Sequence, residues 1–138
     1  MVVSAFRMDT TGWPMIHLEV GAGFDRAELR ALLARFDAVH ERDEPFVILI
    51  DLSNLKVNPG ASMRRCAVDW MREHKAQGER LNRGTAIVFE SVVIRQALTA
   101  IFWVWKPPVP LGTFRDGAAA RAFLTKKAAE AGITLPPA

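Results

Sequence analysis

The chain has only one cysteine, Cys66, among its 138 residues, so no disulfide can form within it. Disulfides are typical of oxidising compartments, and this cysteine usage favours a reducing cytoplasm. No apolar run approaches the roughly 20 residues that cross a bilayer. The opening segment MVVSAFRMD does not place basic residues before a long apolar stretch, so no signal peptide is expected. We therefore expect a cytoplasmic protein without a transmembrane segment.

Motifs for catalysis and cofactor binding are also missing. Gly21-Ala22-Gly23 lacks the lysine and the spacing of a phosphate-binding loop. No histidine and cysteine residues follow zinc-site spacing, and no serine lies in a nucleophile elbow. Asp51 is the one acidic residue that the pattern places at a strand end, and one carboxylate does not define acid–base catalysis. The sequence predicts no catalytic, cofactor-binding or metal-binding residue. An enzyme whose residues meet only in the folded chain remains an alternative.

Two side chains with chemical potential have a simpler structural interpretation. His17 is expected on the polar side of a strand, and no second histidine or cysteine lies at ligand spacing. We therefore predict a surface or hydrogen-bonded histidine rather than a metal ligand. Cys66 is expected on an apolar helix face, where a cysteine most often acts as a small buried hydrophobic residue.

Acidic and basic residues are unevenly distributed along the chain. Residues 1–60 hold six Lys/Arg and nine Asp/Glu, whereas residues 61–138 hold twelve and six, which gives −3 and +6 and the net +3. Acidic residues interrupt the basic ones throughout, so solvated helix faces are the favoured explanation. Aromatic residues do not alternate with the basic ones as stacking platforms for nucleic acid would. No specific nucleic-acid partner is predicted, and weak non-specific binding stays open.

The composition indicates one globular domain over residues 1–138, since 50% of the residues are hydrophobic and 24% are charged. The chain is organised around residues 46–62, FVILIDLSNLKVNPGAS. Five apolar residues precede Asp51, which is typical of a strand that is covered on both faces. Asn58, Pro59 and Gly60 then interrupt regular structure before a helical pattern begins. Ligands and partners of open α/β sheets gather at the carboxyl ends of such strands, so we expect the working surface there.

The remaining patterns predict a mixed α/β sheet of about five strands with about four helices. The first two strands should form an antiparallel hairpin around the turn that ends at Gly12, and the later strands should be parallel. Asp25 and Asp116 should cap helices, and Gly132 should end the last one. A polar, turning segment is expected over residues 75–84. Strands are predicted over residues 2–8, 14–20, 46–50, 85–89 and 109–115, and helices over 25–41, 60–74, 92–105 and 116–132.

The predicted helix over residues 92–105 is apolar on nearly every side, with Arg95, Gln96 and Thr99 as its polar residues. Such a helix must be buried or must contact a partner. A homodimer would cover the surplus apolar surface through a two-fold axis. A pocket lined by Trp70, Trp103 and Trp105 is the alternative, and a cavity of several hundred Å³ would favour it.

The order of elements, the segment Asp51-Leu52-Ser53 with Leu55 and Val57 behind it, and the last strand and helix together resemble a known family. Thr113-Phe114-Arg115-Asp116, followed by Ala120, Phe123 and Leu124, belongs to the same likeness. The chain resembles the STAS domains of anti-sigma-factor antagonists, and above all their STAS/SEC14-like bacterial relatives with a SpoIIAA-like fold. The resemblance covers nearly the whole chain and implies a single STAS-like domain.

In the antagonists an Asp-Ser-Ser-Gly motif begins the second helix, and phosphorylation of a serine controls partner binding. Here Gly60 and Ala61 stand where the two serines would be, and Ser62 falls on the motif's glycine. Neither Gly60 nor Ala61 can accept a phosphate. The resemblance therefore implies an interaction module without the usual phosphoacceptor serine, and we predict that Ser62 is not a regulatory site.

We accordingly predict a non-enzymatic regulatory or scaffolding module that binds another protein, or a second copy of itself, and needs no cofactor. The alternative is a small carrier or sensor of an apolar ligand or lipid, as the SEC14-like relatives suggest. Asp51 should hold its loop by accepting backbone N–H groups. The candidate interaction surface comprises Asp51, Ser53, Asn58, Ser62, Arg64, Arg65, Trp103 and Trp105.

Overall fold

The computed structural model describes residues 5–55, 59–104, 106 and 109–137. Five strands form one sheet in the order β1-β2-β3-β4-β5. The strands β1 and β2 pair antiparallel, and the other neighbours pair parallel. The strands are β1 (Phe6–Asp9), β2 (Met15–Val20), β3 (Phe46–Asp51), β4 (Asn82–Val88) and β5 (Leu111–Phe114). The predicted hairpin, the parallel strands and the central position of β3 are confirmed.

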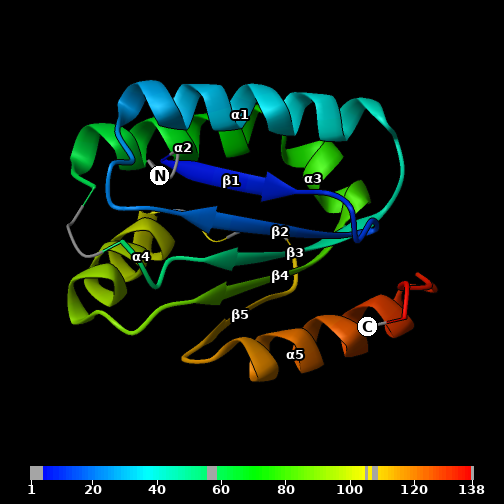
Figure 1. Ribbon diagram of the computed structural model, residues 1–138. Helices are drawn as coiled ribbons and strands as arrows, with labels where there is room; N and C mark the ends of the chain where they lie inside the picture. The colour runs from blue at the N-terminus through cyan, green and yellow to red at the C-terminus, as the bar shows by residue number, and fades with distance from the viewer. Residues whose placement is uncertain (1–4, 56–58, 105, 107–108, 138) are drawn as a thin grey trace.

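Helices cover both faces of the sheet (Figure 1). The helices α1 (Arg26–Glu41), α2 (Ala61–Glu73), α3 (Lys75–Leu81) and α4 (Val92–Val104) lie on one side, and α5 (Gly117–Glu130) lies on the other. Alternation along β3 explains the two layers, because Phe46 and Ile48 face the first core while Val47 and Leu49 face the second. No helix among the described residues is long and apolar enough to span a membrane.

Local signals fixed several helix ends as predicted. The Asp25 carboxylate accepts the N–H of Glu28 at 2.9 Å, and the Asp116 carboxylate accepts the N–H of Ala119 at 2.8 Å. Both are side-chain caps that satisfy an N–H left open by the helix start. At the far end of α5, Gly132 has a φ of 73°, which is the left-handed conformation expected of a helix-ending glycine.

Two details of the helices differ from the sequence prediction. The segment expected to turn over residues 75–84 instead contains α3, so the described residues hold five helices rather than about four. Leu81 explains this difference, because its fully buried side chain anchors an otherwise polar helix to the first core. On α5, the apolar pattern predicts Ala119, Ala120, Phe123 and Leu124 as the inward residues, but Ala119 is exposed and the buried stripe consists of Ala120, Leu124 and Ala128.

A candidate ligand cavity between the sheet and helices α1 to α4

A cavity of about 280 Å³ lies between the first face of the sheet and the helices that cover it. Its floor is formed by β3 and β4, through Ile48, Ile50 and Ile87. Apolar side chains of α1, α2 and α4 complete most of the wall. These are Leu33, Phe36, Ala67, Trp70, Met71, Leu98, Ile101 and Phe102. The arrangement is that of a small-molecule pocket, largely apolar with a few polar groups.

The cavity exists because α2 does not rest closely on the sheet. The helical spacing of Met63, Ala67, Trp70 and Met71 predicts an inward stripe on α2, but these residues are only half-buried, and Val68 is the buried residue of this helix. The helix packs against α1 and α3. Ala67 and Gly78, both facing the cavity, contribute little or no side-chain volume to fill the gap. The space that a close-packed core would fill is therefore left open.

Three aromatic rings form one end of the cavity. Trp70 on α2 stacks on His74 with centroids 4.2 Å apart, and on His40 of α1 with centroids 5.4 Å apart. His74 Nδ1 lies 2.8 Å from the carbonyl oxygen of Trp70, and His74 Nε2 lies 3.2 Å from the Asp37 carboxylate. The indole Nε1 of Trp70 donates to the same carboxylate at 3.2 Å. These contacts fix the orientation of Trp70 and His74.

His40 lines the cavity, and one of its two ring nitrogens has no hydrogen-bond partner in the described part of the chain. Its residue is only 8% exposed, and its Nδ1 is buried without a hydrogen-bond partner among the described residues. Burial lowers the pKa of His40 below its ordinary value, and the neighbouring His74 lowers it further. The ring is therefore neutral at neutral pH. A buried nitrogen without a partner costs about 1–3 kcal/mol, which a hydrogen bond from a bound molecule would recover.

The other polar residues of the cavity floor are already paired. The Asn82 side-chain amide donates to the Thr85 hydroxyl oxygen at 2.9 Å, and Asn82 Oδ1 accepts the Gly84 N–H at 3.1 Å. Asn82 and Thr85 therefore satisfy each other and the backbone, whereas His40 has a ring nitrogen with capacity for a ligand. Its position was visible in the sequence, because His40 follows Phe36 by four residues on the apolar stripe of α1.

The predicted pocket of three tryptophans is only partly correct. Trp70 lines the cavity, but Trp103 is 88% exposed and does not. The helix period explains the difference, since Leu98, Ile101 and Phe102 face the sheet while Trp103 extends the solvent-facing stripe that begins at Val92. Trp105 lies outside the described residues. Trp103 is not covered by the described part of its own chain, so the expected cover by a second copy stays a prediction.

The predicted interaction residues lie on different parts of the molecule. Asp51 ends β3 on the face that α5 covers, and its carboxylate accepts the N–H of the half-buried Ser53 at 2.9 Å. This is the loop-holding contact predicted for Asp51. Trp103 lies on α4, on the opposite side of the sheet.

The α2 members of that set lie near one another. Ser62 and Arg65 are exposed and line a shallow groove between α1 and α2, and Arg64 is half-buried. Gly60 precedes this helix with a φ of 91° and has no side chain to cap it. Asn58 falls outside the described residues. His17 was predicted at the surface or hydrogen-bonded, but it is half-buried and its Nε2 has no hydrogen bond in the described part of the chain.

Comparison with known proteins identifies the fold. No family model matches the chain, and no curated protein matches it. A solved structure does match, that of an uncharacterized protein of the DUF3478 family with a SpoIIAA-like fold from Shewanella loihica PV-4. The two are 14% identical and superpose with a TM-score of 0.63 over 90% of this chain and 98% of the other. The chain therefore has a SpoIIAA-like fold, as the resemblance in the sequence implied.

Proposed function

We propose that this SpoIIAA-like domain binds a small apolar molecule with one polar group in the cavity between its sheet and helices α1 to α4, and that it does so without catalysis. The observation that carries the proposal is His40, whose buried Nδ1 has no partner within the described residues and whose ring lines an otherwise largely apolar cavity. A hydroxyl or protonated acid group on the ligand would donate to this nitrogen. The hydrocarbon part would contact Ile50, Ile87 and Phe102.

The cavity volume limits the size of the ligand. A cavity of about 150 Å³ accommodates benzene, so about 280 Å³ corresponds to roughly eleven non-hydrogen atoms. A bicyclic aromatic alcohol or a medium-chain alcohol or acid fits this limit. A phospholipid does not fit without a large movement of α2. The proposal therefore favours a metabolite-sized ligand over a bulk membrane lipid.

Binding of a soluble probe tests the proposal. The fluorescent alcohol 2-naphthol has the predicted size, and its titration should show saturable binding to one site. Ala67→Phe places a ring where Ala67 now faces the cavity, and should abolish binding while leaving the melting temperature unchanged or raised. Ala122→Phe is the matched control, because Ala122 is exposed on α5, and it should bind like wild type. Binding that survives Ala67→Phe would overturn the proposal.

A protein partner is the second candidate, and exposed apolar residues on α4 favour it. Val92 is 61% exposed and Trp103 is 88% exposed, and both lie on the same stripe of the helix. Exposed tryptophan is typical of binding surfaces, where it often contributes much of the binding energy. A regulatory or scaffolding role would then use this stripe, with a second copy of the chain as the simplest partner. The two candidates use different residues, so Ala67→Phe and Trp103→Lys separate them.

A further inference from the structure

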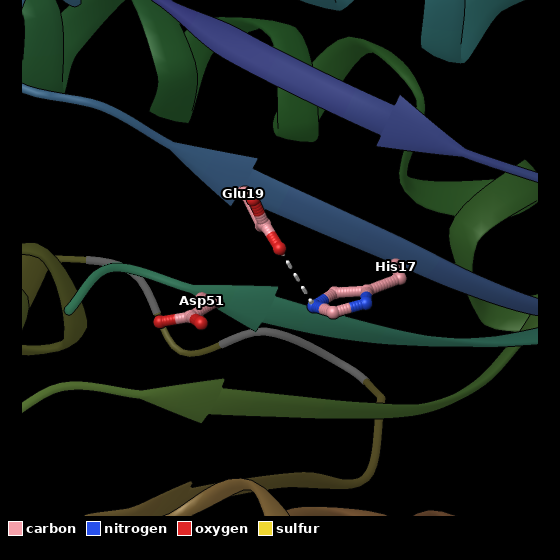
Figure 2. A group of neighbouring side chains, drawn as sticks. All are labelled: His17, Glu19 and Asp51. Carbon is pink, nitrogen blue, oxygen red and sulfur yellow. Dashed lines mark ion pairs between the residues drawn. The ribbon is translucent and has the colours of Figure 1, made fainter. Parts of the chain in front are cut away.

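A second cluster lies on the opposite face of the sheet, away from the cavity. His17 and Glu19 project from β2 on the side that faces α5, and Asp51 projects from the end of β3 on the same side (Figure 2). Glu19 and Asp51 are direct cross-strand partners in the parallel register, and His17 is the next residue on that face of β2. The pairing of β2 with β3 thus brings one imidazole and two carboxylates together, although Asp51 is far from His17 and Glu19 in the sequence.

The donor atoms of this cluster are close together but do not satisfy one another. One ligand atom from each residue lies within 4.8 Å of the other two. His17 Nε2 lies 3.8 Å from a carboxylate oxygen of Glu19, which is too long for a hydrogen bond. That nitrogen is buried, although the His17 side chain as a whole is 31% exposed, and it has no hydrogen-bond partner among the described residues.

The charges of Glu19 and Asp51 are not balanced by a nearby basic side chain in the described chain. Two carboxylates directly opposite each other on neighbouring strands repel. Within the described chain, neither Glu19 nor Asp51 forms an ion pair with a lysine or arginine. Arg7, the cross-strand neighbour of Glu19 on β1, pairs with Asp9 at 3.7 Å instead. A cation between the two carboxylates would remove the repulsion.

We propose that His17 Nε2 and the carboxylates of Glu19 and Asp51 bind one divalent first-row transition ion such as Zn²⁺ or Mn²⁺. Imidazole favours zinc and its neighbours in the series over Mg²⁺ and Ca²⁺, while carboxylates bind both kinds of ion. With each donor about 2.1 Å from zinc, no two donors are more than about 4.2 Å apart. The donor atoms lie within 4.8 Å of one another in the structure, and a small rotation of the side chains would bring them to the separation that zinc requires. Two carboxylates also match the charge of a divalent ion.

The surroundings supply two features of a metal site. Asp51 accepts the Ser53 N–H at 2.9 Å, a contact from outside the donor set that fixes the orientation of the carboxylate. His17 also lines a groove of about 640 Å³ between β2 and the carboxyl-terminal half of α5, where Met15 and Thr125 lie. Solvent therefore reaches the His17 side chain, although Nε2 itself is buried. Three protein ligands leave at least one coordination position for water.

Calorimetry with the metal-free full chain tests this site. Titration with ZnCl₂ near neutral pH should show one saturable site. His17→Gln and Asp51→Asn should each weaken zinc binding by at least about tenfold, because each removes a ligand. His74→Gln is the matched control, because it disrupts the rival pair of His74 and Asp37, and it should bind zinc as wild type does. Absence of saturable binding, or loss in His74→Gln but not in Asp51→Asn, would overturn the proposal.

A second measurement does not depend on whether the variants fold. Mn²⁺ added to the wild-type protein should broaden the amide signals at the carboxyl ends of β2 and β3, around Glu19 and Asp51. Signals near His74 should keep their width. Broadening centred on His74, or no local broadening, would contradict the site. The ligand cavity lies on the other face of the sheet, so failure of either proposal leaves the other standing.

Discussion

The ring of His40 on α1 lies against the ring of Trp70 on α2, with centroids 5.4 Å apart and an interplanar angle of 25°. This contact joins α1 and α2 at one end of the cavity, where there is open space between α2 and the sheet. One side of Trp70 is fixed by its bond to Asp37, whereas His40 retains an unused nitrogen. The two stacked rings therefore form a fixed part of the cavity wall, and His40 Nδ1 is the atom there that can accept a hydrogen bond from a ligand.

The role of His40 can be separated from cavity shape by two ligands. His40→Phe keeps a ring of similar size and removes the nitrogen. A neutral hydrogen bond contributes about 0.5–1.5 kcal/mol, so the affinity for 2-naphthol should fall by up to about tenfold. The affinity for naphthalene, which cannot donate, should stay the same or rise. Fluorescence titration of both ligands measures this difference. Equal losses for both ligands would mean that His40 acts only through packing.

His40 also makes stability depend on pH. Its folded pKa is below the ordinary 6.5 because of burial and of His74, with Asp37 and Arg80 as the other charged neighbours. As pH falls through about 6.5 the unfolded chain binds a proton that the folded chain does not, so stability decreases. Above that pH the stability contribution is fully present, and it is lost as pH falls toward the folded pKa. Urea unfolding between about pH 7.5 and pH 5.5 should therefore show decreasing stability.

Two variants check that His40 causes this dependence. In His40→Phe the decrease between the two pH values should be clearly smaller. In His17→Gln, measured with a chelator present, the decrease should remain, since His17 lies on the other face of the sheet. A wild-type slope that is unchanged in His40→Phe would assign the effect to other groups.

The exposed Trp103 predicts self-association. Leaving a large apolar side chain in water forgoes roughly 1.5–3 kcal/mol, and a two-fold dimer through α4 would cover Trp103 from each copy. Sedimentation at micromolar concentration should show a dimer for wild type and a monomer for Trp103→Lys. Thr125→Lys, an exposed change on α5, should leave the dimer intact. A wild-type monomer would leave a different protein as the partner of α4.

Ser62 is expected to carry no regulatory phosphate. It is exposed in the first turn of α2, and the resemblance to the antagonists implies that Gly60 and Ala61 stand where that family has its serines. Mass spectrometry of the protein from its native cells should find Ser62 unmodified, and Ser62→Ala should leave partner binding unchanged. Substantial phosphorylation of Ser62 would contradict this prediction and would indicate that phosphate regulates partner binding, as it does in the antagonists.

The elements that could be predicted are those specified by local sequence. The five apolar residues before Asp51 predicted β3, and Asp25 and Asp116 predicted two helix starts, because each signal lies within a few residues of the structure it determines. The helix α3 was missed because Leu81 is its only fully buried residue in the described chain, so no apolar stripe announces it. A single inward side chain cannot show the helical spacing of apolar residues on which the prediction of a helix depends.

The two sites were harder to predict because neither is local. The cavity is a gap between α2 and the sheet, and a gap has no residue pattern of its own. The pairing of Glu19 with Asp51 depends on the register of β2 against β3, and a shift of one residue would send the two carboxylates to opposite faces. His17 could therefore not be recognised as part of a cluster from its spacing to other histidines and cysteines.

The central claim is that a small apolar molecule occupies the cavity, and amide and indole spectra of the wild-type protein during 2-naphthol titration test it most directly. The account predicts saturable shifts of the Trp70 indole N–H and of the amides of Ala67, Ile87 and Leu98, which surround the cavity. Signals of Ala122 and Thr125 on α5 should not move. Shifts confined to Trp103 and the exposed stripe of α4, or no saturable shifts at all, would contradict the claim.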